Sequence, residues 1–182
     1  VGAVSSGCFA ELGHTVIGVD VSPEKVAMLG TGRSPIVEAD IDTLIANNVR
    51  AGRLRATTDV TAAIAESDLS FIAVGTPSAA DGSVSLQAIE AVLDSIGRAI
   101  AAKPGPHTVV MRSTVPAGTA ETLAIPRLEA SSGRKLGQGL HYYSNPEFLR
   151  EGSAVRDFHG PAMTLIGAPL GDDAAALREL YA

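Results

Sequence analysis

The chain has 182 residues, of which 46% are hydrophobic and 19% charged, and its net charge is −6. This size suits one α/β domain, and 14 Lys and Arg against 20 Asp and Glu argue against binding to a nucleic-acid backbone. No apolar run reaches the roughly 18 residues of a membrane span, no signal-peptide pattern is present, and a single cysteine forms no internal disulfide. We therefore expect a globular cytoplasmic protein without membrane or nucleic-acid partners.

The first half of the chain alternates helix-like and strand-like segments. Residues 14–21 form an apolar, β-branched run that is typical of a strand buried on both faces of a parallel sheet. Ser22 followed by Pro23 predicts the N-cap and first residue of a helix. The expected elements are helices over 1–12, 23–29, 40–51 and 59–66, and strands over 14–21, 53–57 and 69–74.

The second half repeats this alternation. A loop over 78–83, with its turn at Asp81-Gly82, precedes the clearest amphipathic helix, and a polar, Gly-rich loop is expected over 131–139. The expected elements are helices over 85–102 and 116–130, and strands over 107–114, 141–144 and 163–166. Because helices separate most of the strands, the sequence predicts an α/β fold with a doubly wound, parallel sheet.

Both ends of the chain interrupt an expected element. Val1 opens directly into a helical pattern with no strand before it, and residues 180–182 close the chain inside another helix-like run. We interpret the chain as most of a domain that is cut short at both ends.

Asp20 ends the first expected strand, 20 − 2 = 18 residues after Gly2. In dinucleotide-binding βαβ units, an acid at this position accepts hydrogen bonds from the adenosine ribose and favours NAD over NADP. The spacing fits if Gly2 is the third glycine of G-x-G-x-x-G, with the first two glycines upstream of Val1. An ordinary helix–strand pair with an acidic turn explains the same residues equally well.

Two further strand ends carry hydroxyl groups. Thr76 lies in the Gly-Thr-Pro turn after the strand over 69–74, and Ser113 and Thr114 end the strand over 107–114. Ligands bind at the carboxyl ends of parallel strands, so either loop is a candidate cofactor contact. The alternatives are a plain turn for Thr76 and helix capping for Ser113 and Thr114.

The densest polar cluster is the segment 145–152. Glu147 and Glu151 are four residues apart and would share one face of a helix, where two carboxylates could serve proton transfer and substrate binding. The alternative is a helix whose first turn is simply stabilised by acidic residues.

Cysteine and histidine offer no separate chemistry. Cys8 lies on the expected packed face of the first helix and reads as a small core residue. The histidines lack metal-ligand or triad spacing, so we expect no metal site and a structural or exposed role for His14, His107, His141 and His159.

Taken together, six blocks of the sequence resemble the UDP-glucose/GDP-mannose dehydrogenase family. The last two blocks are long and specific, and all six occur in the family's order and spacing. The blocks are residues 1–3, 16–20, 34–38, 74–77, 112–119 and 145–152.

The resemblance implies a Rossmann-like, mainly parallel sheet whose first strand is missing from this chain. Residues 1–182 would be the incomplete N-terminal NAD-binding domain, and the central helical and C-terminal substrate domains, with the nucleophilic cysteine, would lie beyond Ala182. The implied reaction is NAD-dependent oxidation of the C6 alcohol of a nucleotide sugar to the carboxylate, with two NAD consumed. The full-length protein would be a homodimer or higher homo-oligomer, and this chain alone would be inactive.

The same resemblance implies roles for individual residues. Thr114 and Glu147 would be the catalytic residues within this chain, positioning water or relaying a proton near C6. The NAD-binding residues would be Val1, Gly2, Asp20, Lys25, Thr76 and Thr114. The nucleotide-sugar-binding residues would be Phe148, Leu149, Arg150 and Glu151.

Within the family, the blocks over 34–38, 112–115 and 161–167 are most similar to the GDP-mannose branch. This favours oxidation of GDP-mannose to GDP-mannuronate, a precursor of an acidic, alginate-like exopolysaccharide. UDP-glucose or another UDP-sugar is the alternative substrate, and a non-catalytic NAD-binding module is the alternative of another class. Ala39 and Asp40 depart from the family's usual Pro-Gly at these positions.

Overall fold

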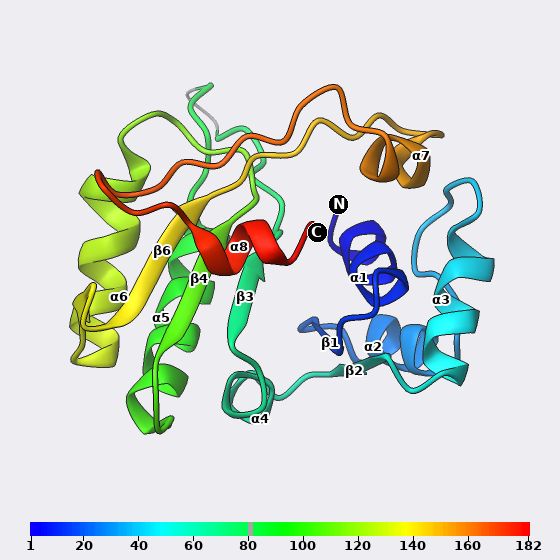
Figure 1. Ribbon diagram of the computed structural model, residues 1–182, viewed down its shortest axis with the longest axis horizontal. Coiled ribbons are helices and arrows are strands. Elements are labelled where there is room, and N and C mark those ends of the chain that lie inside the picture. Colours follow the sequence, from blue (N-terminus) through cyan, green and yellow to red (C-terminus); the bar gives the residue numbers. More distant parts are fainter. Residues whose placement is uncertain (80–81) are drawn as a thin grey trace. The chain divides into compact units, whose positions relative to one another are not determined.

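The computed structural model describes residues 1–79 and 82–182 (Figure 1). Asp81 falls outside these ranges, so the expected turn at Asp81-Gly82 lies outside the described residues. The chain divides into two compact units. Unit 1 comprises Val1–Asp59, Phe148–Thr164 and Ala174–Ala182, and unit 2 comprises Val60–Glu147 and Leu165–Asp173. Within the described ranges, every helix is too short or too polar to cross a membrane.

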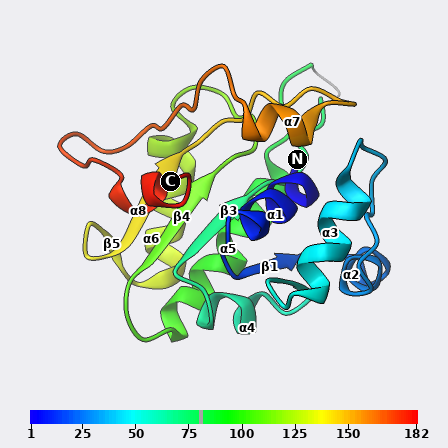
Figure 2. The same cartoon turned by 45° about the vertical axis from the view of Figure 1, so that its right-hand side comes forward.

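Unit 1 is a two-stranded parallel sheet with helices packed on it. The strands pair in register from Val16 opposite Leu54 to Val19 opposite Thr57. Helix α1 packs against α3, and α2 packs against β2 (Figure 2). The elements are α1 (Gly2–Glu11), β1 (Val16–Val19), α2 (Pro23–Gly30), α3 (Ile41–Arg50), β2 (Leu54–Thr57), α7 (Ala154–His159) and α8 (Ala175–Glu179).

Local sequence signals explain where the elements of unit 1 begin and end. The Ser22 hydroxyl accepts a hydrogen bond from the Lys25 N–H at 3.3 Å, and Pro23 occupies the first turn, which confirms the predicted start of α2. Gly13, at φ 103°, ends α1 in a conformation that other residues rarely adopt. Gly7 lets α1 approach α3, because a Cβ there would lie 2.9 Å from Leu44 Cδ2.

Aromatic rings join α1 to the later segments of unit 1. The Phe9 ring meets the Phe158 ring edge-on at 5.0 Å between centroids and the Tyr181 ring at 5.2 Å. The His14 ring nitrogen Nε2 lies 2.9 Å from the Leu180 carbonyl oxygen. Cys8 is fully buried within α1, which confirms its predicted place in the core.

Unit 2 is a four-stranded parallel sheet in the order β3-β4-β6-β5. Helices α5 and α6 pack together, and their apolar side chains meet those of β4 and β6 in one core that includes Leu93, Val109 and Leu128. The elements are α4 (Val60–Ala65), β3 (Leu69–Ile72), α5 (Gln87–Ala102), β4 (His107–Met111), the π-helix η1 (Ala120–Ala124), α6 (Ile125–Ser132), β5 (Lys135–Leu136) and β6 (Gly139–Ser144).

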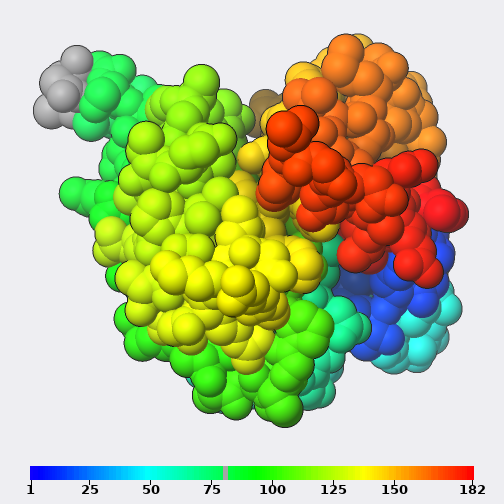
Figure 3. All heavy atoms as spheres, turned by 60° about the vertical axis from the view of Figure 1, so that its left-hand side comes forward, coloured from blue at the N-terminus to red at the C-terminus, as the bar shows by residue number. Residues whose placement is uncertain are grey.

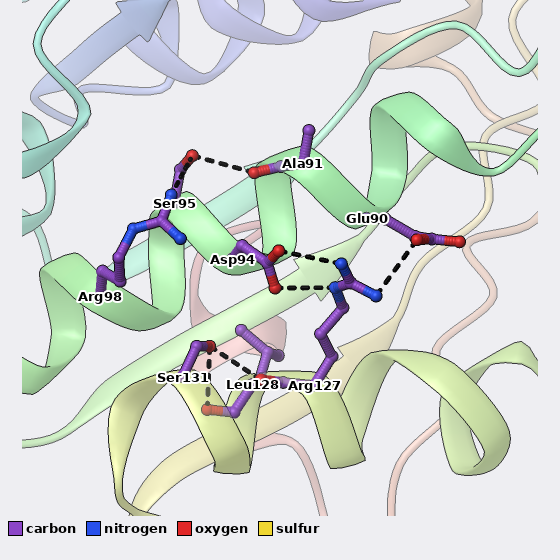
Figure 4. A network of polar contacts seen from close by, with 8 residues as sticks. All are labelled: Glu90, Ala91, Asp94, Ser95, Arg98, Arg127, Leu128 and Ser131. Atoms are coloured by element: carbon purple, nitrogen blue, oxygen red, sulfur yellow. Dashed lines mark hydrogen bonds and ion pairs between the residues drawn. The ribbon is translucent and has the colours of Figure 1, made fainter.

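Helices α5 and α6 are joined by polar contacts as well as by the core. Arg127 of α6 forms a bidentate pair with Asp94 of α5, with nitrogen–oxygen distances of 2.7 and 2.9 Å, and its Nη1 lies 3.1 Å from Glu90 Oε2 (Figure 4). The two parallel hydrogen bonds between Arg127 and Asp94 fix the register of α6 along α5. The segment 120–145, which includes α6, forms the broad yellow-green and yellow surface in Figure 3.

The structure confirms the predicted α/β class with parallel strands but corrects several of the expected elements. The strand expected over 163–166 is absent from the described residues; only one antiparallel bridge, Ser144 to Gly167, forms there. Met163 and Leu165 are 60% and 49% exposed, so this apolar run lacks the burial that favours a strand.

The second correction concerns the loop expected over 131–139. Helix α6 continues to Ser132 and ends at Gly133, whose φ is 69°, and the short strand β5 follows. Gly137 and Gly139, at φ 76° and 81°, then turn the chain tightly into β6. The glycines therefore mark the ends of short elements within this segment.

Candidate cofactor and substrate site

Helix α1 begins at Gly2 with an open first turn. Val1 is the N-cap and makes no side-chain cap, and no acidic residue lies in the first turn. The first N–H groups of a helix have no partner within the helix, and together with the helix dipole they favour an anion. This end of α1 therefore suits a pyrophosphate, the ligand that the resemblance implies for Val1 and Gly2.

Asp20 follows the carboxyl end of β1, where the sequence predicts a ribose-binding acid. Its N–H donates to the Thr57 carbonyl, and its Oδ1 accepts from the Ser22 N–H at 2.9 Å. Its Oδ2 lies 3.7 Å from Lys25 Nζ, with side-chain exposures of 40% and 57%. An ion pair this open costs little to rearrange. The carboxylate is thus held in place and remains able to accept from the two hydroxyls of an adenosine ribose, so the chain fits NAD at this point.

In unit 2, the strand register brings Thr76, Thr114 and Glu147 to one edge of the sheet. Ile72 pairs with Met111, and Met111 pairs with Ser144. Because the strands are parallel, the residues that follow these positions emerge at the same edge, where ligands bind in such folds. Thr114 lies three residues beyond Met111, and Glu147 lies three residues beyond Ser144, so the two occupy matched positions after paired residues.

Side chains tie the strand-end loops of unit 2 together. The Thr76 hydroxyl donates to the Thr114 carbonyl at 3.1 Å, and the Ser113 hydroxyl donates to the Val74 carbonyl at 2.7 Å. The π-helix begins only at Ala120 and has Thr119 as its N-cap, so capping by Ser113 or Thr114 is ruled out. Ser113 instead fixes the turn that carries Thr76.

A buried arginine, which the sequence analysis did not single out, supports the same edge. Arg112 is 4% exposed, its Nη1 donates to Asn145 Oδ1 at 2.7 Å, and its guanidinium lies 5.8 Å from the centre of the Phe71 ring. Asn145 Nδ2 in turn donates to the Leu165 carbonyl at 2.8 Å. The long, specific blocks of the resemblance contain Arg112 and Asn145, but only the strand pairing shows that they meet.

The segment 145–150 contains no helix, which corrects the helix considered for Glu147 and Glu151. Glu147 and Glu151 therefore do not share a helix face; α7 begins only at Ala154. Pro146 disfavours a helical conformation at Asn145, and Gly152, at φ 78°, makes the turn that leads into α7. Glu147 belongs to unit 2 and Glu151 to unit 1.

Arg150 is held by a carboxylate of its own segment. Its Nη2 and Nε donate to Asp157 at 2.7 and 3.0 Å, and its backbone N–H donates to the same side chain at 3.1 Å. The Ser153 hydroxyl adds a fourth hydrogen bond at 3.0 Å. These contacts, led by the Arg150 guanidinium, hold the pKa of Asp157 well below its usual range.

The other predicted substrate residues lie beside Arg150. Phe148 is 56% exposed, which is unusual for a large apolar side chain and leaves its ring available to a ligand. Leu149 is partly buried, and Glu151 is exposed. No cluster of three or more metal-ligating side chains occurs among residues 1–79 and 82–182.

Parallel strands joined by helices, an open helix start and an acid directly after the first strand are typical of a dinucleotide-binding domain of the dehydrogenase type. Comparison with known families narrows this class. Residues 1–182 match the NAD-binding domain of the UDP-glucose/GDP-mannose dehydrogenase family, and the chain belongs to that family. NAD is therefore its cofactor.

Curated relatives share sequence with the whole chain. GDP-mannose 6-dehydrogenase of Azotobacter vinelandii is 46% identical over 182 residues, and UDP-glucose 6-dehydrogenase of Haloferax volcanii is 42% identical over 182 residues. The chain is fully covered in both comparisons but spans 42% of the length of either relative.

Solved structures agree with the fold. A ternary complex of GDP-mannose dehydrogenase from Pseudomonas aeruginosa is 46% identical, with a TM-score of 0.97, over 100% of this chain and 42% of that one. A UDP-glucose dehydrogenase from Pyrobaculum islandicum is 43% identical, with a TM-score of 0.90, over 99% of this chain and 40% of that one.

Proposed function

We propose that the protein carrying this chain oxidises the C6 alcohol of GDP-mannose to the carboxylate of GDP-mannuronate, with two NAD reduced. The observation that carries the proposal is 46% identity to GDP-mannose 6-dehydrogenase over every residue of the chain. The corresponding identity to UDP-glucose 6-dehydrogenases is 42% and 40%. These values favour the GDP-mannose branch and keep a UDP-sugar as the second candidate.

The family resemblance gives each unit its own set of cofactor contacts. In unit 1, the open start of α1 at Val1 and Gly2 receives the pyrophosphate, and Asp20 with Lys25 binds the adenosine ribose. When bound, NAD supplies the hydride acceptor for oxidation at C6. In unit 2, Thr76 and Thr114 form the strand-end loops that contact the cofactor further along.

The catalytic contribution of this chain comes from Thr114 and Glu147. Both follow adjacent parallel strands at matched positions, so both reach the same edge of the sheet of unit 2. Thr114 is exposed there and offers a hydroxyl, and the partly buried carboxylate of Glu147 accepts a proton or orients a water molecule near C6. Phe148, Leu149, Arg150 and Glu151 bind the nucleotide sugar. A cytoplasmic location and assembly into a homodimer or higher homo-oligomer stay predictions.

The cofactor assignment is tested first through Asp20. We expect Asp20→Asn to raise the KM for NAD about tenfold or more, because an amide accepts fewer ribose hydroxyl hydrogen bonds than a carboxylate. Glu24→Gln is the matched control, since Glu24 is an exposed acid in the next helix. Steady-state kinetics of NADH formation compare the two variants, and an unchanged KM in Asp20→Asn contradicts the assignment.

The substrate is tested by counting NADH per sugar consumed, at saturating NAD, with GDP-mannose, UDP-glucose and UDP-N-acetylmannosamine in parallel. The full-length gene product is used. Two NADH per GDP-mannose, with little from the other sugars, is the expected result. The same stoichiometry with a UDP-sugar would retain the reaction and reassign the substrate. NAD binding without turnover of any sugar would favour a non-catalytic module.

A further inference from the structure

The loop between α2 and α3 exposes apolar side chains and turns an acid inward. Val37 is 104% exposed and Ile36 39%, whereas Glu38 is partly buried. A surface loop normally presents its charge to water and covers its apolar groups. The inverted arrangement at Glu38 is compensated by the hydrogen bonds that its carboxylate accepts.

Those hydrogen bonds come from a segment more than a hundred residues away in sequence. Glu38 Oε2 accepts from the Gly152 N–H at 2.9 Å, and Oε1 accepts from the Ala154 N–H at 3.3 Å. Oε1 also accepts from the Ala39 N–H at 3.1 Å. The loop between α2 and α3 lies beside α7 in both ribbon views (Figures 1 and 2). All of these residues belong to unit 1.

The loop that carries Glu38 is itself fixed. The buried Ser34 donates its backbone N–H to Asp42 Oδ1 of α3 at 2.9 Å, and its hydroxyl donates to the Ile36 carbonyl at 2.7 Å. Ser34 thus anchors one end of the loop to α3. A carboxylate on a fixed loop can hold a mobile partner in one place, because little further entropy is lost on contact.

The partner of Glu38 is the turn that connects Arg150 to α7. On one side of this turn, Asp157 binds the Arg150 side chain and N–H. Glu38 binds the N–H groups on the other side, at Gly152 and Ala154. Gly152 has φ 78° and an exposed backbone, so without an external partner the turn could adopt other conformations. Asp157 holds the turn locally, and Glu38 ties it to the rest of unit 1.

We propose that Glu38 is a positioning residue for the nucleotide sugar, acting through the Gly152 turn to fix Arg150 and Glu151. This inference rests on the proposed function, in which Phe148 to Glu151 bind the sugar nucleotide. Glu38 does not contact the substrate in this scheme. Its removal raises the cost of ordering the turn on binding and therefore weakens substrate affinity rather than cofactor affinity.

The experiment compares Glu38→Gln and Glu38→Ala with Glu11→Gln in the full-length protein. Glu11 is the matched control, because its carboxylate also contacts α7 but at His159, 2.9 Å away, and not at the turn. Amide hydrogen exchange at Gly152 and Ala154 measures the hold on the turn directly. Initial rates then give KM for the nucleotide sugar, KM for NAD and kcat, and thermal unfolding reports stability.

We expect both amides to exchange about tenfold faster in Glu38→Ala, and the KM for the sugar to rise about tenfold. Glu38→Gln, which keeps one acceptor oxygen, should give an intermediate effect. The KM for NAD should stay unchanged in both variants, and Glu11→Gln should match the parent protein throughout.

Four other results would overturn the inference. Unchanged exchange would show that Glu38 does not hold the turn. Faster exchange with an unchanged KM for the sugar would show that Glu38 holds the turn without affecting substrate binding. An equal rise in both KM values with a lower Tm would show that Glu38 has only a structural role. If the parent protein turned over no nucleotide sugar, the proposed function would fail together with the substrate role, while the exchange data would still report the contact.

Discussion

Asp40 adopts a left-handed backbone conformation that glycine accepts more readily. Its φ is 62°, it is the N-cap of α3, and its side chain makes no cap hydrogen bond. The family's usual Pro-Gly places glycine at this position, so the departure noted in the sequence has a steric consequence. A non-glycine residue in this region is strained, although aspartate tolerates it better than most.

We therefore expect Asp40→Gly to stabilise the protein by roughly 0.5 kcal/mol, the relief of strain being partly offset by the greater freedom of glycine in the unfolded chain. The control is Asp42→Gly, two residues on and inside α3. That change should destabilise by about 1 kcal/mol or more, since it places glycine in a helix and removes the partner of the Ser34 N–H. Thermal unfolding of both variants shows whether each change raises or lowers stability. Equal losses of stability in the two variants would refute the strain argument.

At the scale of elements, the close approach of α5 and α6 depends on Gly97. A Cβ at this position would lie 1.7 Å from Ser131 Oγ and 2.7 Å from Ser131 Cβ. The Ser131 hydroxyl donates to the Arg127 carbonyl at 2.7 Å within α6 (Figure 4). Rotation of the hydroxyl alone cannot relieve the contact with Cβ, so the helices would have to separate.

We expect Gly97→Ala to lower the free energy of unfolding by about 1 to 3 kcal/mol, despite the better helix propensity of alanine. Gly30→Ala, in α2, is the control because a Cβ there meets nothing within 4 Å. The double change Gly97→Ala with Ser131→Gly should recover much of the loss, because it removes the clashing side chain. Chemical denaturation measures the free energy of unfolding of each variant. If the double variant lost the sum of the two single losses, this clash would be excluded as the cause.

Helices and strands were predicted well where several local sequence signals point to the same element. Strand character, Pro at a helix start and Gly after a helix end located α1, β1, α2 and α5 within a few residues. The strand expected over 163–166 failed because an apolar run pairs only if a partner edge and burial are available, and neither can be read from local pattern. The helix considered for Glu147 and Glu151 is absent, because a spacing of four between two acids is compatible with a helix but does not require one.

For the whole molecule, the sequence proposes candidate site residues but not the contacts that hold them. The observed register in the sheet of unit 2 carries Thr76, Thr114 and Glu147 to one edge. The link from Glu38 to Gly152 spans distant segments, and no spacing rule predicts it. Non-local contacts of this kind require the fold itself.

The acid stability of the whole protein should depend on one buried histidine in unit 2. His107, at the start of β4, is 1% exposed. Its Nε2 lies 2.8 Å from Ser70 Oγ, and its Nδ1 lies 3.1 Å from Lys103 Nζ, which also contacts the Ser67 carbonyl. Burial and the Lys103 ammonium lower the pKa of His107 to about 4; Arg134 also opposes its protonation, while Asp68 and the Ser67 backbone act in the opposite direction. The folded protein therefore keeps this ring neutral where an unfolded chain would protonate it.

The pH dependence follows from that difference. Below its ordinary pKa of 6.5, His107 binds a proton in the unfolded chain but not in the folded one until the pH nears 4. The free energy of unfolding should thus fall as the pH drops from about 6.5 to 4, by up to about 3 kcal/mol, and stay level with respect to this group above 6.5. We expect His107→Gln to flatten the profile in this window, whatever its effect at neutral pH, in denaturation curves taken at several pH values. An imidazole proton resonance of His107 that titrates near 6.5 in the folded protein would contradict the argument, because the two states would then bind the proton equally.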